Sequence, residues 1–131
     1  MKRFLALLAL TSALHAEPPA GFWAALHQVE TSGRVGAIVG DNGRSLGPLQ
    51  ISRAYFADSR VGGAYEQVAD LPFAIKVASA YMKRYEPEAW RAGNVEVLAR
   101  LHNAGPNWRR KLSATDVYAA KVRSAVYKQS N

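Results

Sequence analysis

Two carboxylates in the first half of the chain have types and a spacing that could serve one reaction. Glu30 ends a helical pattern, and Asp41 opens the turn sequence Asp41-Asn42-Gly43. Cleavage of a glycosidic bond uses two carboxyl groups. One is protonated and donates to the leaving oxygen, while the other is ionised and attacks the sugar, stabilises its positive charge or activates water. The pair therefore suggests a glycosidase.

The local settings of the two residues fit these two roles. Glu30 follows Val29 at the end of an apolar helix, with Trp23 and Leu26 on the preceding turns, and an apolar wall favours a protonated acid. Asp41 lies on a polar turn, where backbone N–H groups and hydroxyls favour an ionised one. Spacing alone favours a plainer interpretation, because a Glu at a helix end is usually a solvated charge and an Asp before Asn-Gly is usually a turn former.

The elements that would position the pair are a helix and a hairpin. Apolar spacing predicts a helix over 20–30, which Thr31-Ser32-Gly33 ends. The apolar runs 35–39 and 46–51 flank Asp41-Asn42-Gly43 and predict a hairpin, with Pro48 indicating an edge or irregular second arm.

The rest of the chain predicts helices. Residues 53–58 form one short turn, and the apolar residues of 73–85 fall nearly all round a helix, which is therefore expected to be buried and central. The expected fold class is α+β, mainly α, with several helices around the central one and a small β-hairpin. Start and stop signals delimit the later helices: Asp70 with Pro72, Asn94, Gly105-Pro106 and a capping-box-like Ser113-Ala114-Thr115-Asp116.

Four ordered segments resemble the destabilase-like, invertebrate-type lysozymes. The stretch VETSGR…GDNGRSLGPLQISRAYFADS is similar to that family's core motif, with Glu30 as its catalytic Glu, Asp41 as its turn Asp, Ser45–Ile51 as its S-x-x-G-x-x-Q-I run and Tyr55-Phe56 as its aromatic pair. AYMKRY (80–85), LHNAGPNW (101–108) and ATDVYAAKV (114–122) follow in the family's order. Together they cover most of the chain.

The chain departs from the family pattern in three ways. The invertebrate enzymes are rich in cysteine, and this chain has none. Thr31-Ser32 stands where the family has Ser directly after the Glu, and one residue is missing between Asp41 and the G-x-x-Q-I run. These departures suggest a bacterial, cysteine-free relative.

The resemblance implies a lysozyme-like fold and a muramidase, which hydrolyses the β-1,4 bond between N-acetylmuramic acid and N-acetylglucosamine in peptidoglycan. Glu30 would be general acid and then base, and Asp41 the nucleophile or ion-pair stabiliser, with retention of configuration and no cofactor. Four further residues would shape the substrate cleft, each with an ordinary structural alternative such as a strand, cap or core position: Gln50, His102, Asn103 and Tyr118. Trp23, Trp90 and Trp108 are candidates for stacking on sugars or for packing.

Two other functions remain open. The G-x-x-Q-I, H-N-A-G-P and T-x-x-Y-x-x-K-V segments also resemble soluble lytic transglycosylases and goose-type lysozymes. A transglycosylase would use Glu30 alone and release an anhydro-sugar, so the presence of Asp41 favours hydrolysis. The third function is a non-catalytic wall-binding module or a partner of an export or secretion apparatus, against which the retention of both carboxylates argues.

Composition limits the remaining functions. The chain has 131 residues, 49% of them hydrophobic, which is enough for one domain with a core. Its net charge of +7 favours acidic polymers such as cell wall or an anionic membrane surface, with nucleic acid a weaker expectation. Without cysteine there is no disulfide or thiol chemistry, and no His-x-x-x-His or carboxylate cluster has metal spacing.

The first residues predict a signal peptide. Met1-Lys2-Arg3 is a positive start, Phe4–Leu14 is an apolar run, and cleavage fits after Ala16 or Ala13. We therefore expect residues 1–16 to be removed and 17–131 to form one exported domain, periplasmic or secreted, without stable membrane insertion. An uncleaved anchor or a buried N-terminal helix is the alternative.

Overall fold

The computed structural model describes residues 18–129, so the expected signal peptide at 1–16 lies outside the described residues. None of the helices in the described part has the length and apolarity that a membrane span requires. The elements follow one another in this order: α1 (Phe22–Thr31), β1 (Val39–Gly40), η1 (Asp41–Gly43), β2 (Ser45–Leu46), β3 (Ile51–Ser52), α2 (Arg53–Ser59), η2 (Tyr65–Ala69), α3 (Leu71–Tyr85), α4 (Pro87–Ala92), α5 (Val95–Ala104), η3 (Trp108–Arg110) and α6 (Leu112–Gln129).

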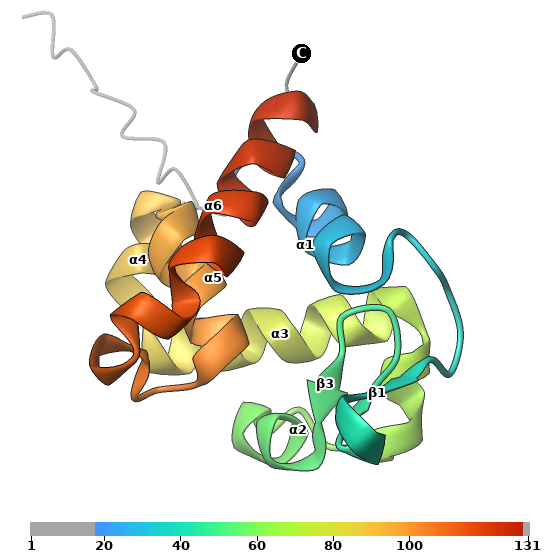
Figure 1. Cartoon of the computed structure of the whole chain (residues 1–131). Coiled ribbons are helices and arrows are strands. Elements are labelled where there is room, and N and C mark those ends of the chain that lie inside the picture. Colours follow the sequence, from blue (N-terminus) through green and yellow to red (C-terminus); the bar gives the residue numbers. More distant parts are fainter. Residues whose placement is uncertain (1–17, 130–131) are drawn as a thin grey trace, which may run out of the picture.

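Helix α3 is central, as the sequence predicts. It crosses the middle of the molecule, with α1, α5 and α6 on one side and the sheet and α2 on the other (Figure 1). The Asp70 carboxylate accepts a hydrogen bond from the Phe73 backbone N–H at 3.1 Å and caps the helix start. Burial is less complete than the pattern suggested, because Lys76 and Lys83 lie on an exposed face.

The helices around α3 share one apolar core. Asn94 caps α5 by accepting from the Val97 backbone N–H at 3.1 Å, and Gly105 ends it, both as predicted. The capping box at 113–116 is wrong, because α6 begins at Leu112. Fully buried side chains from α1, the third strand and the turn before it, α3, α5 and α6 fill the core: Phe22, Leu26, Leu49, Ile51, Val77, Met82, Leu98, Leu101 and Val122.

The sheet contains the predicted hairpin and one strand more. It is antiparallel in the order β1-β2-β3, with Val39 opposite Leu46 and Leu46 opposite Ile51. The run 46–51 is therefore two strands rather than one arm, because residues 47–50 turn back on themselves. Gly47 has φ +83, which a glycine adopts without strain, and the Gln50 backbone N–H donates to the Gly47 carbonyl at 3.0 Å.

The turn Gly47–Gln50, called the central turn below, is fixed by side chains from both neighbouring helices. The Thr31 hydroxyl, at the end of α1, donates to the Pro48 carbonyl at 2.9 Å. The His102 ring, on α5, donates from Nε2 to the Leu49 carbonyl at 2.9 Å. The central turn thus connects the end of α1 with α5 across the sheet.

We expect Gly47→Ala to destabilise the protein far more than Gly43→Ala. A Cβ at Gly47 would lie 2.1 Å from the Val68 carbonyl oxygen, while a Cβ at Gly43 would meet nothing within 4 Å. Both glycines have positive φ, so Gly43→Ala should cost about 1 kcal/mol through backbone strain alone. Gly47→Ala should cost about 3 kcal/mol or more. Urea unfolding of the two variants checks this, and equal losses would contradict it.

Candidate active site

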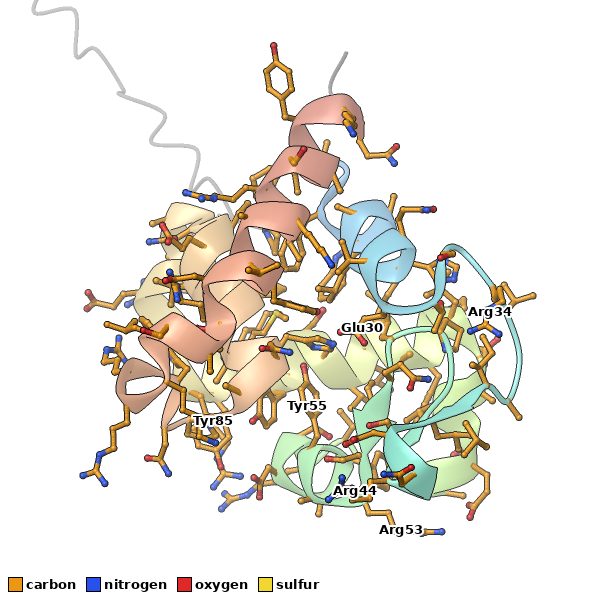
Figure 2. The ribbon with its side chains drawn as sticks, viewed as in Figure 1. Glu30, Arg34, Arg44, Arg53, Tyr55 and Tyr85 are labelled. Atoms are coloured by element: carbon orange, nitrogen blue, oxygen red, sulfur yellow. The ribbon has the colours of Figure 1, made fainter. Side chains whose placement is uncertain are left out.

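A groove runs between the sheet and the helices and collects most of the predicted site residues. Its inner part, of about 300 Å³, is lined by Glu30, Asp41, Ser45, Gln50, His102 and Asn103. An adjoining part, of about 350 Å³, shares all of these except Glu30 and extends past Tyr55, Asp58, Tyr81 and Pro106. Figure 2 shows Glu30 at the end of α1 facing the sheet, with Tyr55 on α2. The shared lining makes the two parts one continuous groove.

Glu30 lies in the last turn of α1 with 15% of its side chain exposed. The Tyr118 hydroxyl donates to its Oε1 at 2.5 Å, and within the described residues Oε2 has no hydrogen-bond partner. Burial raises the pKa of Tyr118 well above its usual value, and the neighbouring Glu30 carboxylate adds to this. Tyr118 therefore remains a phenol, which orients the Glu30 carboxyl group through Oε1.

The apolar wall expected for Glu30 is not made by Trp23. That residue precedes Glu30 by seven positions, about 10 Å along the helix axis. Its ring contacts Phe22 at 5.0 Å and Trp90 at 6.4 Å between centroids and lines a different hollow. Leu26 is fully buried in the core. The partners that reach Oε1 are instead the neutral rings of Tyr118 and His102.

His102 is a buried, neutral ring with both nitrogens engaged. The Tyr55 hydroxyl donates to Nδ1 at 2.9 Å, and Nε2–H donates to the Leu49 carbonyl at 2.9 Å, which fixes the tautomer. Burial lowers the pKa of His102, and the opposing effects of Glu30 and Leu49 are smaller. The 3.9 Å approach of Nε2 to Glu30 Oε1 is therefore no ion pair. The predicted contact of His102 with substrate stays a prediction.

Asp41 lies on the opposite wall and has a different environment. Its side chain is 62% exposed, and Arg44 Nη2 lies 3.2 Å from Oδ1. An exposed pair of this kind contributes less than about 1 kcal/mol. Asp41 and Asn42 have φ of +51 and +56, which Asp and Asn tolerate better than other side chains. The structure thus brings both predicted carboxylates to one hollow.

Two predicted binding residues differ in what they can offer a ligand. The Gln50 side-chain amide donates to the Ile38 carbonyl at 3.1 Å and the Gly47 carbonyl at 2.9 Å, so its donors serve the central turn. Asn103 is exposed at the end of α5, and its amide has no hydrogen-bond partner in the described part of the chain. Asn103 is therefore free to bind a polar ligand, while Gln50 has only its oxygen to spare.

Sequence reasoning singled out no binding role for several groove residues. Ser45 and Asp58 lie within the quoted core motif, which was the available signal, and Tyr81 lies within AYMKRY. The Tyr55 and Tyr81 rings stack at 3.6 Å between centroids, a contact between distant segments that no local pattern reveals. Among residues 18–129, no group of three His, Asp or Glu side chains is arranged to hold a metal ion.

Because the folded state keeps His102 neutral, we expect stability to depend on pH. The unfolded chain takes up a proton at this histidine near pH 6.5, whereas the folded protein resists it. The free energy of unfolding should therefore fall as the pH drops below about 6.5. The fall should be smaller in His102→Gln than in the wild-type protein. Denaturant titrations between pH 7 and 5 measure it, and an identical fall in His102→Gln would refute the assignment.

Known proteins resemble this chain in sequence and structure. No protein-family model matches. The lysozyme of Ostrea edulis is 37% identical over 83 residues, which cover 60% of this chain and 61% of that protein. Lysozyme 1 of Crassostrea virginica is 35% identical over 85 residues, which cover 63% of this chain and 46% of that protein. The chain thus spans less than two thirds of the length of these relatives.

A solved structure matches more of the fold. A chain in the crystal structure of Aeromonas hydrophila PliI in complex with Meretrix lusoria lysozyme superposes with a TM-score of 0.66 and 29% identity, covering 82% of this chain and 89% of that one. The resemblance to lysozymes that the motifs indicated is therefore confirmed: the chain is similar to two lysozymes at 35–37% identity and has a lysozyme-like fold.

Proposed function

We propose that the chain is a lysozyme, which hydrolyses the β-1,4 bond between N-acetylmuramic acid and N-acetylglucosamine in peptidoglycan. One observation carries the proposal: Glu30 and Asp41 line the same hollow from opposite walls and in unlike surroundings. Glycoside hydrolysis needs such a pair. The two curated relatives, both named lysozyme, support the same function.

In the first step, Glu30 acts as the acid. Its Oε2 would give a proton to the glycosidic oxygen while Tyr118 holds Oε1, and the leaving sugar would depart. Asp41, open to the groove, would attack the sugar C1 or stabilise its positive charge. Glu30, now ionised, would then take a proton from the incoming water, whose oxygen bonds to C1 while any bond between C1 and Asp41 breaks and frees the Asp41 carboxylate, with overall retention of configuration.

The remaining parts of the proposal concern the setting. Removal of residues 1–16 would leave 17–131 as an exported catalytic domain that needs no cofactor, in the periplasm or outside the cell. Without Lys2 and Arg3 that domain keeps 15 Lys and Arg against 10 Asp and Glu, and this net charge of +5 favours contact with anionic wall polymer. The unpartnered Asn103 amide would bind the sugar's acetamido or hydroxyl groups, and the exposed side chains of the groove wall would line the strand.

We expect Glu30→Gln to lower the rate of peptidoglycan hydrolysis by about 10³-fold or more, because the amide cannot deliver a proton. Its fold should persist, since the amide oxygen still accepts from Tyr118. Release of soluble fragments from purified peptidoglycan measures the rate. The matched control is Glu66→Gln, an exposed carboxylate outside the groove that pairs with Arg53 at 3.7 Å, and it should keep wild-type activity. Equal activity of the Glu30 and Glu66 variants would sink the proposal.

A second candidate, a lytic transglycosylase that uses Glu30 alone, is favoured by the exposure of Asp41 and its link to Arg44. Asp41→Asn separates the two functions, because Asn suits the same left-handed backbone and removes only the charge. Hydrolysis predicts a loss of about 10²-fold or more, and transglycosylation predicts little change. Mass spectrometry of the products is independent of this variant: reducing ends indicate a hydrolase, and anhydro ends indicate a transglycosylase.

A further inference from the structure

A second hollow, of about 380 Å³, lies where α1, α3 and α4 meet the segment 18–21. We call it the tryptophan hollow; its side-chain walls are Trp23, Ile75, Ser79, Lys83 and Trp90. The three α3 residues follow one another at four-residue spacing and form one stripe of the helix. Tyr81, which lines the groove, is two positions from Ser79 and faces the opposite side of α3. The tryptophan hollow is therefore separate from the groove.

The indole rings of Trp23 and Trp90 form the apolar wall of the tryptophan hollow, and they also carry N–H donors. The rings of Trp23 and Trp90 lie 6.4 Å apart between centroids at an interplanar angle of 48°. Trp90 is only 8% exposed, yet its indole N–H has no hydrogen-bond partner in the described part of the chain. No enclosed side-chain nitrogen or oxygen there lacks a partner, so this N–H must reach open space. Trp90 lines the tryptophan hollow, which provides such open space.

The polar groups around the indoles favour an anion. Lys83 Nζ lies 5.0 Å from the centre of the Trp90 ring and, within residues 18–129, pairs with no carboxylate. The Ser79 hydroxyl likewise has no partner there. No acidic residue lines the tryptophan hollow. A carboxylated sugar would satisfy all of these groups. Its ring would stack on an indole, its hydroxyls would hydrogen-bond to the indole N–H and to Ser79, and its carboxylate would pair with Lys83.

We propose that the tryptophan hollow is a second glycan-binding site, specific for strands of amino sugars that carry carboxylates. The identification of that strand as peptidoglycan rests on the proposed function; the site itself does not. Because it lies across α3 from the groove, a strand held there leaves the groove free to act on a neighbouring strand. The site would keep the protein on an insoluble polymer between cleavage events.

Binding to insoluble peptidoglycan tests the proposal. Co-sedimentation is measured with the full protein in a Glu30→Gln background, so that the polymer is not consumed. Lys83→Gln should weaken binding about threefold, and Trp23→Leu, which keeps an apolar side chain in the contact with Phe22, about fivefold. Lys121→Gln removes the same charge from an exposed helix position and should bind like the parent. Lys83→Gln should leave binding to neutral chitin unchanged.

A second readout separates this site from the groove. In the active protein, Lys83→Gln and Trp23→Leu should cleave short soluble peptidoglycan fragments at the wild-type rate while losing activity on the insoluble polymer. Wild-type sedimentation of Lys83→Gln, or an equal loss in Lys121→Gln, would overturn the proposal. If sedimentation depends on Lys83 but the protein with Glu30 intact cleaves neither substrate, the lysozyme function is refuted and the second site stands.

Discussion

Two buried carbonyl groups of the central turn, those of Pro48 and Leu49, accept hydrogen bonds from side chains that the site depends on. A buried carbonyl left without a partner costs about 1–3 kcal/mol, so the turn requires these donors. The donors are Thr31, which directly follows Glu30, and His102, which directly precedes Asn103. The same bonds that satisfy the turn therefore fix the positions of the acid and of the free amide at the groove.

Glu30 and Asp41 have different surroundings because side chains from different elements contact them. Glu30 is approached by a phenol from α6 and an imidazole from α5, both held neutral by burial. Within the described residues no lysine or arginine forms an ion pair with Glu30, whereas Asp41 is largely exposed and has Arg44 beside it. Two carboxyl groups in such unlike surroundings, one largely buried and one exposed, can divide acid and nucleophile roles between them.

Local chemistry made much of the fold predictable. Capping by Asp70 and Asn94 and the stop at Gly105 depend on nearest neighbours, and the structure has all three. The third strand was missed because the run 46–51 is apolar except for Gln50, and its reversal depends on a tertiary fit of Gly47 against the Val68 carbonyl. The absence of the predicted capping box has a similar cause, since Asp116, its fourth residue, accepts from Arg100 Nη2 at 2.7 Å instead.

The residues of the site were predictable from sequence, but the long-range hydrogen bonds that bring them together were not. Glu30, Asp41, His102 and Asn103 were identified from ordered motifs, and they line one hollow. The bonds that join Tyr118 to Glu30 and Tyr55 to His102 span 88 and 47 residues, and sequence spacing carries no information about them. Sequence spacing also does not reveal that the Gln50 side-chain amide donates hydrogen bonds to the Ile38 and Gly47 carbonyls.

The connection between the two carboxylates has a consequence for stereochemistry. Residues 32–40 alone separate the end of α1 from Asp41, and the Ile38 carbonyl, which accepts from the Gly47 N–H at 2.8 Å, anchors their far end. One residue more or less in such a span changes its reach by up to about 3.5 Å. Carboxyl groups about 5–5.5 Å apart give retention, and those about 6.5–9.5 Å apart give inversion. The length of one short loop is thus sufficient to choose between the two anomers of the product.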